Sequence, residues 1–114
     1  MAVVILRKKP TEGKLAQITE EFKDYVKIVV DLKRKIMAAG GKLHADGEDL
    51  LLKDSSHQEN LWGGGIDLVS KKIDCTAIIN IRPSQENNSM EILDPLKRKK
   101  FFKITKRFFE DYEE

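Results

Sequence analysis

The sequence is poor in the residues that mark several classes of protein. It holds one cysteine, Cys75, so no internal disulfide can form and a disulfide-stapled scaffold is excluded. Its apolar runs are all far shorter than the roughly 18 residues that mark a membrane-spanning helix. The apolar run at residues 2–6 has no basic segment before it, which is untypical of a secretory signal. We therefore expect a cytoplasmic protein with no membrane partner.

An excess of charge of one sign is also missing. The 21 lysines and arginines stand against 19 aspartates and glutamates, which gives a net charge of +2. A balance so near neutral creates no whole-molecule field, so binding to nucleic acid would depend on a local patch. Hydrophobic residues make up 40% of the chain, which is enough to fold. We expect one domain over residues 1–114, because so few residues cannot supply a second core.

The first forty residues carry one clear pattern and one ambiguous pattern. Residues 2–6 are apolar and partly β-branched, which predicts a strand covered on both faces. From Leu15 to Ile36 apolar residues recur at steps of three and four, which favours a long helix that ends at Gly40 and Gly41. Residues 24–32 also alternate as a strand would. We favour the helix because its pattern runs longer.

Two strand signals and a turn signal follow. Asp46 and Gly47 lie between short runs and predict the turn of a two-residue hairpin. The segment Ile73–Arg82 alternates and predicts the best strand of the chain. Its core face consists of Ile73, Cys75, Ala77, Ile79 and Ile81, and its opposite face consists of Asp74, Thr76, Ile78, Asn80 and Arg82. The glycines at 63–65 precede an apolar run that reads as a strand, so they indicate a bulge or a close backbone approach rather than a phosphate-binding loop.

The last third of the chain predicts an amphipathic helix. Asp94 is the expected N-cap, and Pro95 is the expected first helical residue. One side of this helix is apolar and consists of Phe101, Phe102, Ile104, Phe108, Phe109 and Tyr112. The opposite side is cationic and consists of Lys99, Lys100, Lys103, Lys106 and Arg107. Such a distribution is typical of a helix that packs on a sheet with one face in solvent.

The order of these elements indicates a fold class. A strand, a helix, several antiparallel strands and a final helix predict an α+β two-layer sandwich. We expect an antiparallel sheet of about four to five strands packed with two helices. The apolar first strand is also compatible with a homodimer, but no residue pattern identifies the interface.

Four segments resemble a known family. They are Gly40–Asp46, Asp49–Leu52, Leu61–Gly63 and Ile79–Gln85. Together they resemble a family of small bacterial and archaeal proteins classed as a domain of unknown function, and the Asn-Ile-Arg-Pro-Ser-Gln string is the most specific part. The glycines at 63–65 depart from the family pattern. The resemblance implies a small prokaryotic domain, and it brings no activity and no site residues with it.

One candidate site would bind an anion. Asn80, Arg82 and Ser84 offer hydrogen-bond donors at the end of the expected strand, with His44 nearby and Trp62 able to stack on a ligand. An arginine fork suits a carboxylate or a phosphate. The alternative is that Arg82 pairs with an acidic neighbour such as Asp74 or Asp94 and holds the loop.

A second candidate is a metal-assisted hydrolase or nuclease. His44, Asp46 and Glu48 combine an imidazole with two carboxylates, which are common ligands of divalent ions. No second histidine or cysteine completes a recognised metal motif. The alternative is that Asp46 belongs to the turn and Glu48 is a solvated charge.

A third candidate is a nucleic-acid surface on the cationic helix face. Lys99, Lys103 and Lys106 could follow a phosphate backbone, although aromatic residues for base stacking are not interleaved with them. The alternative is an ordinary solvated face. Because no nucleophile and base are paired in the sequence, we favour a non-enzymatic binding or interaction module for an anionic ligand. We assign no catalytic residue, metal or cofactor.

Overall fold

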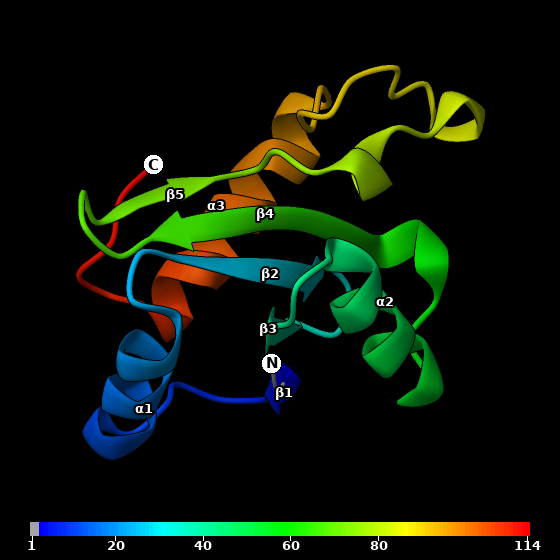
Figure 1. Ribbon diagram of the computed structural model, residues 1–114. Coiled ribbons are helices and arrows are strands. Elements are labelled where there is room, and N and C mark those ends of the chain that lie inside the picture. Colours follow the sequence, from blue (N-terminus) through cyan, green and yellow to red (C-terminus); the bar gives the residue numbers. More distant parts are fainter. Residues whose placement is uncertain (1–2) are drawn as a thin grey trace.

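A computed structural model describes residues 3–114 and contains one five-stranded sheet (Figure 1). In spatial order its strands are β1 (Val3–Leu6), β3 (Ile36–Gly40), β2 (Tyr25–Asp31), β4 (Leu61–Asp67) and β5 (Lys72–Asp74). Every neighbouring pair is antiparallel. The predicted α+β class and antiparallel sheet are confirmed.

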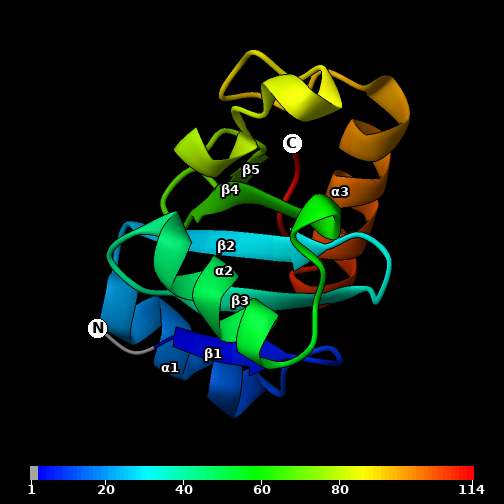
Figure 2. The ribbon, with the colours of Figure 1, turned by 90° about the vertical axis from the view of Figure 1, so that its right-hand side faces the viewer.

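Three helices cover this sheet, where two were expected. The helices are α1 (Glu12–Phe22), α2 (His44–Lys53) and α3 (Pro95–Phe108). On one face, Ile18 of α1 and Phe101 of α3 belong to the same core as Ile28 of β2. On the other face, Leu51 of α2 packs with Val29 of β2. The sheet is therefore buried on both faces, and Figure 2 looks onto the face that α2 covers.

The expected long helix from Leu15 to Ile36 is wrong, and the strand alternative for residues 24–32 is the observed structure. Helix α1 ends at Phe22, and β2 and β3 then form a hairpin. At the turn, the Asp31 carboxylate accepts hydrogen bonds from the backbone amides of Lys33 and Arg34, both at 2.9 Å. Because β2 lies in the middle of a sheet covered on both faces, its apolar residues need not alternate.

The expected hairpin at Asp46 and Gly47 is also wrong, because both residues lie in α2. The Asp46 carboxylate accepts a hydrogen bond of 3.0 Å from the amide of Leu43, the residue before the helix. Gly47 is buried, and a Cβ at this position would lie 3.1 Å from the Val29 side chain and 3.2 Å from that of Ala38. The glycine therefore serves close packing of α2 on the sheet and not a turn.

The strand predicted over Ile73–Arg82 is much shorter than expected. Only Lys72–Asp74 pairs as a strand, and Ile78–Asn80 forms a short 3-10 helix, as do Gln58–Asn60 and Pro83–Gln85. Ile81 is 47% exposed and Asn80 is fully buried, whereas the alternating pattern placed Ile81 in the core and Asn80 on the opposite face. The edge of β4 beyond β5 is therefore left without a neighbouring strand.

The start of α3 agrees with the prediction. The Asp94 carboxylate accepts hydrogen bonds from the amides of Leu96 at 2.8 Å and Lys97 at 3.3 Å, and Pro95 is the first helical residue. Phe101 packs so closely on β4 that a Cβ on Gly64 would lie 2.6 Å from its ring. The nearest atom to such a Cβ is the backbone carbonyl oxygen of Asp74, so Gly64 has the close backbone approach, one of the two roles predicted for these glycines. None of the helices in residues 3–114 has the length and hydropathy to cross a membrane.

Candidate anion-binding surface

Asn80 takes the place of a strand beside β4. Its carboxamide accepts a hydrogen bond of 2.8 Å from the Gly63 amide and donates one of 2.9 Å to the Gly63 carbonyl. A neighbouring antiparallel residue would make the same pair of bonds. The Asn80 Nδ2 atom also lies 3.0 Å from the carbonyl oxygen of Cys75 and 2.9 Å from that of Met90. With no exposed surface, Asn80 satisfies backbone groups that would otherwise be buried and unpaired.

Arg82 continues this role along the same edge. Its Nε donates to the Ile79 carbonyl and its Nη1 to the Gln58 carbonyl, both at 2.9 Å, and its Nη2 donates to the carbonyl of Leu61. The guanidinium lies 4.6 Å from the ring centroid of Trp62. Arg82 is 8% exposed, so its three nitrogens are directed at acceptors within the protein.

The carboxylate of Glu48 compensates the charge of this buried arginine. Its Oε2 lies 3.6 Å from Nη2 of Arg82, and both side chains are largely buried. Glu48 comes from α2, on the helix face that also carries His44. The acidic partner of Arg82 is therefore Glu48, which is far from it in the sequence, and not Asp74 or Asp94 as the loop-holding alternative suggested.

The remaining residues of the predicted anion site fall into two groups. Trp62 is 1% exposed and lies between Arg82 and the ammonium of Lys97, which is 5.1 Å from the ring centroid. The Nε2 atom of His44 is 2.7 Å from the Gly64 carbonyl oxygen, which fixes this nitrogen as the protonated one. Ser84 is exposed in the 3-10 turn Pro83–Gln85. Asn80, Arg82, Trp62 and His44 thus meet along β4. The donors of Asn80 and Arg82 are bonded to backbone carbonyls, and the role of these residues in binding stays a prediction.

Burial sets the titration of His44. The imidazole is partly buried against β4, and this desolvation lowers its pKa below the usual 6.5. The hydrogen bond to Gly64 and the charge of Asp74 act in the opposite direction and are smaller influences. His44 is therefore held in its neutral form in the folded protein at neutral pH.

The three residues of the predicted metal site do not converge. His44 is directed to Gly64, Asp46 caps its own helix at Leu43, and Glu48 faces Arg82. Across residues 3–114, no three His, Cys, Asp or Glu side chains are grouped so that they could hold a metal ion. The hydrolase alternative gains no support from this arrangement.

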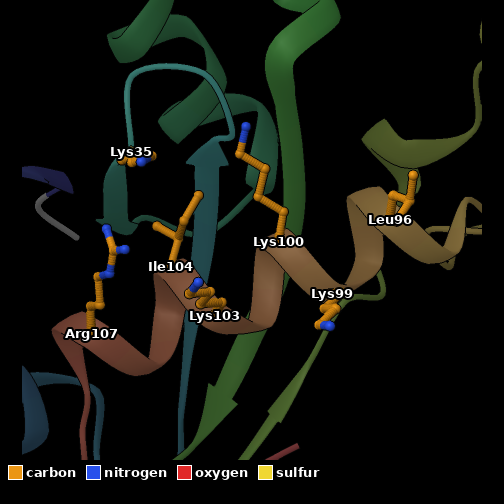
Figure 3. Close-up of a pocket in the computed structure, with 7 residues that line it drawn as sticks. All are labelled: Lys35, Leu96, Lys99, Lys100, Lys103, Ile104 and Arg107. Atoms are coloured by element: carbon orange, nitrogen blue, oxygen red, sulfur yellow. The ribbon is translucent and has the colours of Figure 1, made fainter.

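The cationic face of α3 forms a groove with the turn between β2 and β3. Its cavity has a volume of about 280 Å³, and its lining residues are Lys35, Leu96, Lys99, Lys100, Lys103, Ile104 and Arg107. Figure 3 shows that Lys100, Ile104 and Arg107 project from the same side of α3 toward the turn that carries Lys35. We call these seven residues the cationic groove.

The charges of the cationic groove are not neutralised. Within residues 3–114, none of its four lysines and one arginine forms an ion pair with a carboxylate. Other surface cations do: Arg7 and Arg34 both pair with Asp54, and Lys106 pairs with Glu113. Of the three lysines predicted to bind nucleic acid, Lys99 and Lys103 line the groove, whereas Lys106 lies outside it.

Sequence reasoning missed Lys35 as a member of this surface. The expected helix from Leu15 to Ile36 hid the turn between β2 and β3, where Lys35 adopts a φ of 58°. Asp31 carried a usable signal, because a short acidic residue after an apolar run often begins a turn. Only the strand interpretation of residues 24–32 would have brought Lys35 near the last helix.

Comparison with known proteins gives a family and no activity. The sequence model of one family matches residues 4–108, and that family is described as "Protein of unknown function (DUF5674)". No curated protein and no solved structure matches the chain.

Proposed function

The chain belongs to this family of proteins of unknown function, and we propose that it is a non-enzymatic binding module that takes an anionic ligand in the cationic groove. The single observation that carries the proposal is the set of five cations with no carboxylate among the lining residues. Like charges held close together repel, so this arrangement is unfavourable in the free protein and becomes favourable when an anion binds.

The groove is a better candidate than the residues around Arg82. A ligand at Arg82 would have to displace hydrogen bonds to buried carbonyls, and leaving such groups unpaired costs about 1 to 3 kcal/mol each. The side chains of Lys99, Lys100 and Lys103 are exposed and have no such bonds to lose. An anion can therefore reach the groove without disturbing the fold.

The test is a titration of the protein with fluorescently labelled inorganic polyphosphate. The groove variant carries Lys99→Gln, Lys103→Gln and Arg107→Gln. A matched control carries Lys8→Gln, Lys42→Gln and Lys53→Gln, which removes the same charge from residues outside the groove.

We expect the groove variant to bind polyphosphate at least about tenfold more weakly than the wild type, and the control variant to stay within about twofold. Binding to the wild type should also weaken as salt is added, because the contacts are ionic. Equal losses in the two variants would show that only net charge matters, and the proposal would fail. It would fail equally if the wild type did not bind polyphosphate.

A further inference from the structure

We infer that the ligand of the cationic groove is an acidic amphipathic segment of a partner protein, with carboxylates that meet the cations and apolar side chains that pack on Leu96 and the neighbouring Leu93. This inference rests on the proposed function, because it names the class of anion that the same groove binds. It draws on the exposed aliphatic side chains at the end of the groove, which a purely ionic ligand would leave in water.

The cationic groove also has an apolar part, formed by aliphatic side chains of α3. Ile104 is 2% exposed and forms its floor, whereas Leu96 is 78% exposed at its end. Leu93, three residues before Leu96, is 53% exposed. Leu93 and Leu96 are therefore two exposed aliphatic side chains beside a cluster of cations. Such a surface can bury apolar groups of a ligand and bind its charges at the same time.

A second cavity extends this apolar surface beyond Leu96. It has a volume of about 430 Å³, and Leu96 lines both cavities. Leu93 and Pro95 are among the apolar residues that line the second cavity, and its polar lining residues are Gln85, Glu86, Asn87, Asp94 and Lys97. A ligand that crosses Leu96 can therefore place apolar side chains on both sides of it. A phosphate chain has no apolar groups that could pack on Leu96.

The spacing of the cations suits a helical partner. Lys99, Lys103 and Arg107 follow one another at steps of four residues, so their Cα atoms rise by about 6 Å at each step. Acidic residues four apart on a second helix repeat at the same interval, and carboxylates pair well with lysine and arginine. The exposed side chains of Leu93 and Leu96 are then available to the apolar side of that helix, as in other helix-in-groove complexes.

The groove offers little for reading nucleic acid. Its lining holds no aromatic side chain on which a base could stack, and no Asn, Gln, Ser or Thr for base edges. Trp62 borders the second cavity, but it is 1% exposed and packed beside Arg82 and Lys97. Charge and aliphatic surface favour a peptide over a nucleic acid.

The experiment compares three new labelled probes, with labelled polyphosphate as a fourth, by fluorescence anisotropy with the 114-residue chain. The first is a helical peptide with Glu and Asp on one face and Leu on the other. The second has the same charges with every Leu changed to Ser, and the third is a double-stranded oligonucleotide. Two protein variants are used, Leu96→Ser and the groove variant, and Leu52→Ser serves as a matched control because Leu52 is exposed on α2.

We expect the amphipathic peptide to bind at least about tenfold more tightly than the serine peptide. Leu96→Ser should weaken the amphipathic peptide about tenfold and leave the serine peptide and labelled polyphosphate unchanged, whereas Leu52→Ser should alter none of them. Leu96 is exposed, so its replacement leaves the core intact.

Three outcomes would overturn the inference. Equal affinity for the two peptides would show that the groove binds charge alone, and the proposed function would stand. Tighter binding of the oligonucleotide than of the amphipathic peptide would identify a nucleic-acid surface instead. If no probe, including polyphosphate, bound to the wild type, the proposed function would fall together with the inference.

Discussion

The edge of β4 and the cationic groove are built from similar chemistry and use it differently. At β4, Asn80 and Arg82 direct their donors at backbone carbonyls and are buried. In the groove, Lys99 and Lys103 are exposed and form no ion pair within residues 3–114. The comparison teaches that a cation or an amide points to a ligand only when its donors are not already used by the protein. Four predictions test this contrast.

Removing the Asn80 side chain should have the largest effect. Asn80→Ala leaves the amide and carbonyl of Gly63 buried without partners, and we expect a loss of about 4 kcal/mol in the free energy of unfolding. Urea denaturation measures this loss. Ser84→Ala is the control, because Ser84 is exposed, and it should change stability by less than about 0.5 kcal/mol. A small effect of Asn80→Ala would remove its assignment as a surrogate strand.

The next effect tests the close contact of α3 with β4. Gly64→Ala places a Cβ against the backbone carbonyl of Asp74 on β5 as well as 2.6 Å from the Phe101 ring of α3, so one of these elements must move. We expect a loss of about 2 to 3 kcal/mol in the free energy of unfolding, measured by the same denaturation curves. Gly13→Ala is the control, since no atom lies within 4 Å of a Cβ at that position. Equal effects at the two glycines would contradict the packing described for β4.

Acidification should weaken the folded state through His44. The lowered pKa of His44 means that the unfolded chain takes up a proton more readily than the folded protein. The contribution of neutral His44 to the free energy of unfolding is complete above pH 6.5. It is lost as the pH falls from this value through the lower pKa of the folded state. Unfolding curves of the wild type and His44→Gln across this range measure it. The prediction fails if both proteins show the same dependence on pH.

The smallest effect on stability should come from the groove. The variant Lys99→Gln, Lys103→Gln, Arg107→Gln loses no internal hydrogen bond, so its free energy of unfolding should stay within about 0.5 kcal/mol of the wild type. At low salt a slight gain is expected, because repulsion between the cations is relieved. A loss of unfolding free energy comparable to that of Asn80→Ala would show that the groove cations support the fold. It would contradict the difference described between the groove and the edge of β4.

Local signals in the sequence determined the two ends of the fold. Asp94 and Pro95 located the start of α3, and the apolar run at 2–6 located β1, whose described residues begin at Val3. Both signals depend on neighbouring residues alone, so no knowledge of the tertiary structure was needed. The cationic face of α3 followed from the same periodicity.

The middle of the chain was misjudged because tertiary packing decides its structure. The run Tyr25–Asp31 is apolar on both faces, and this pattern is shared by a buried strand and a buried helix. Asp46 and Gly47 form a pair that is typical of a turn, but Gly47 lies in α2, where the absence of a side chain allows the helix to contact the sheet closely. Asn80 and Arg82 are predicted to face an anionic ligand, but both are buried, and their partners on β4 lie 17 and 21 residues away and have no sequence signature.

The most direct test of the account is a titration of isotopically labelled protein with polyphosphate, followed by NMR chemical shifts of the backbone and side chains. The account predicts that signals of Lys35 and of residues 96–107 move, while the side-chain signals of Asn80 and Arg82 stay in place. Movement at Asn80, Arg82 and His44, with α3 unchanged, would contradict it and return the anion site to the edge of β4.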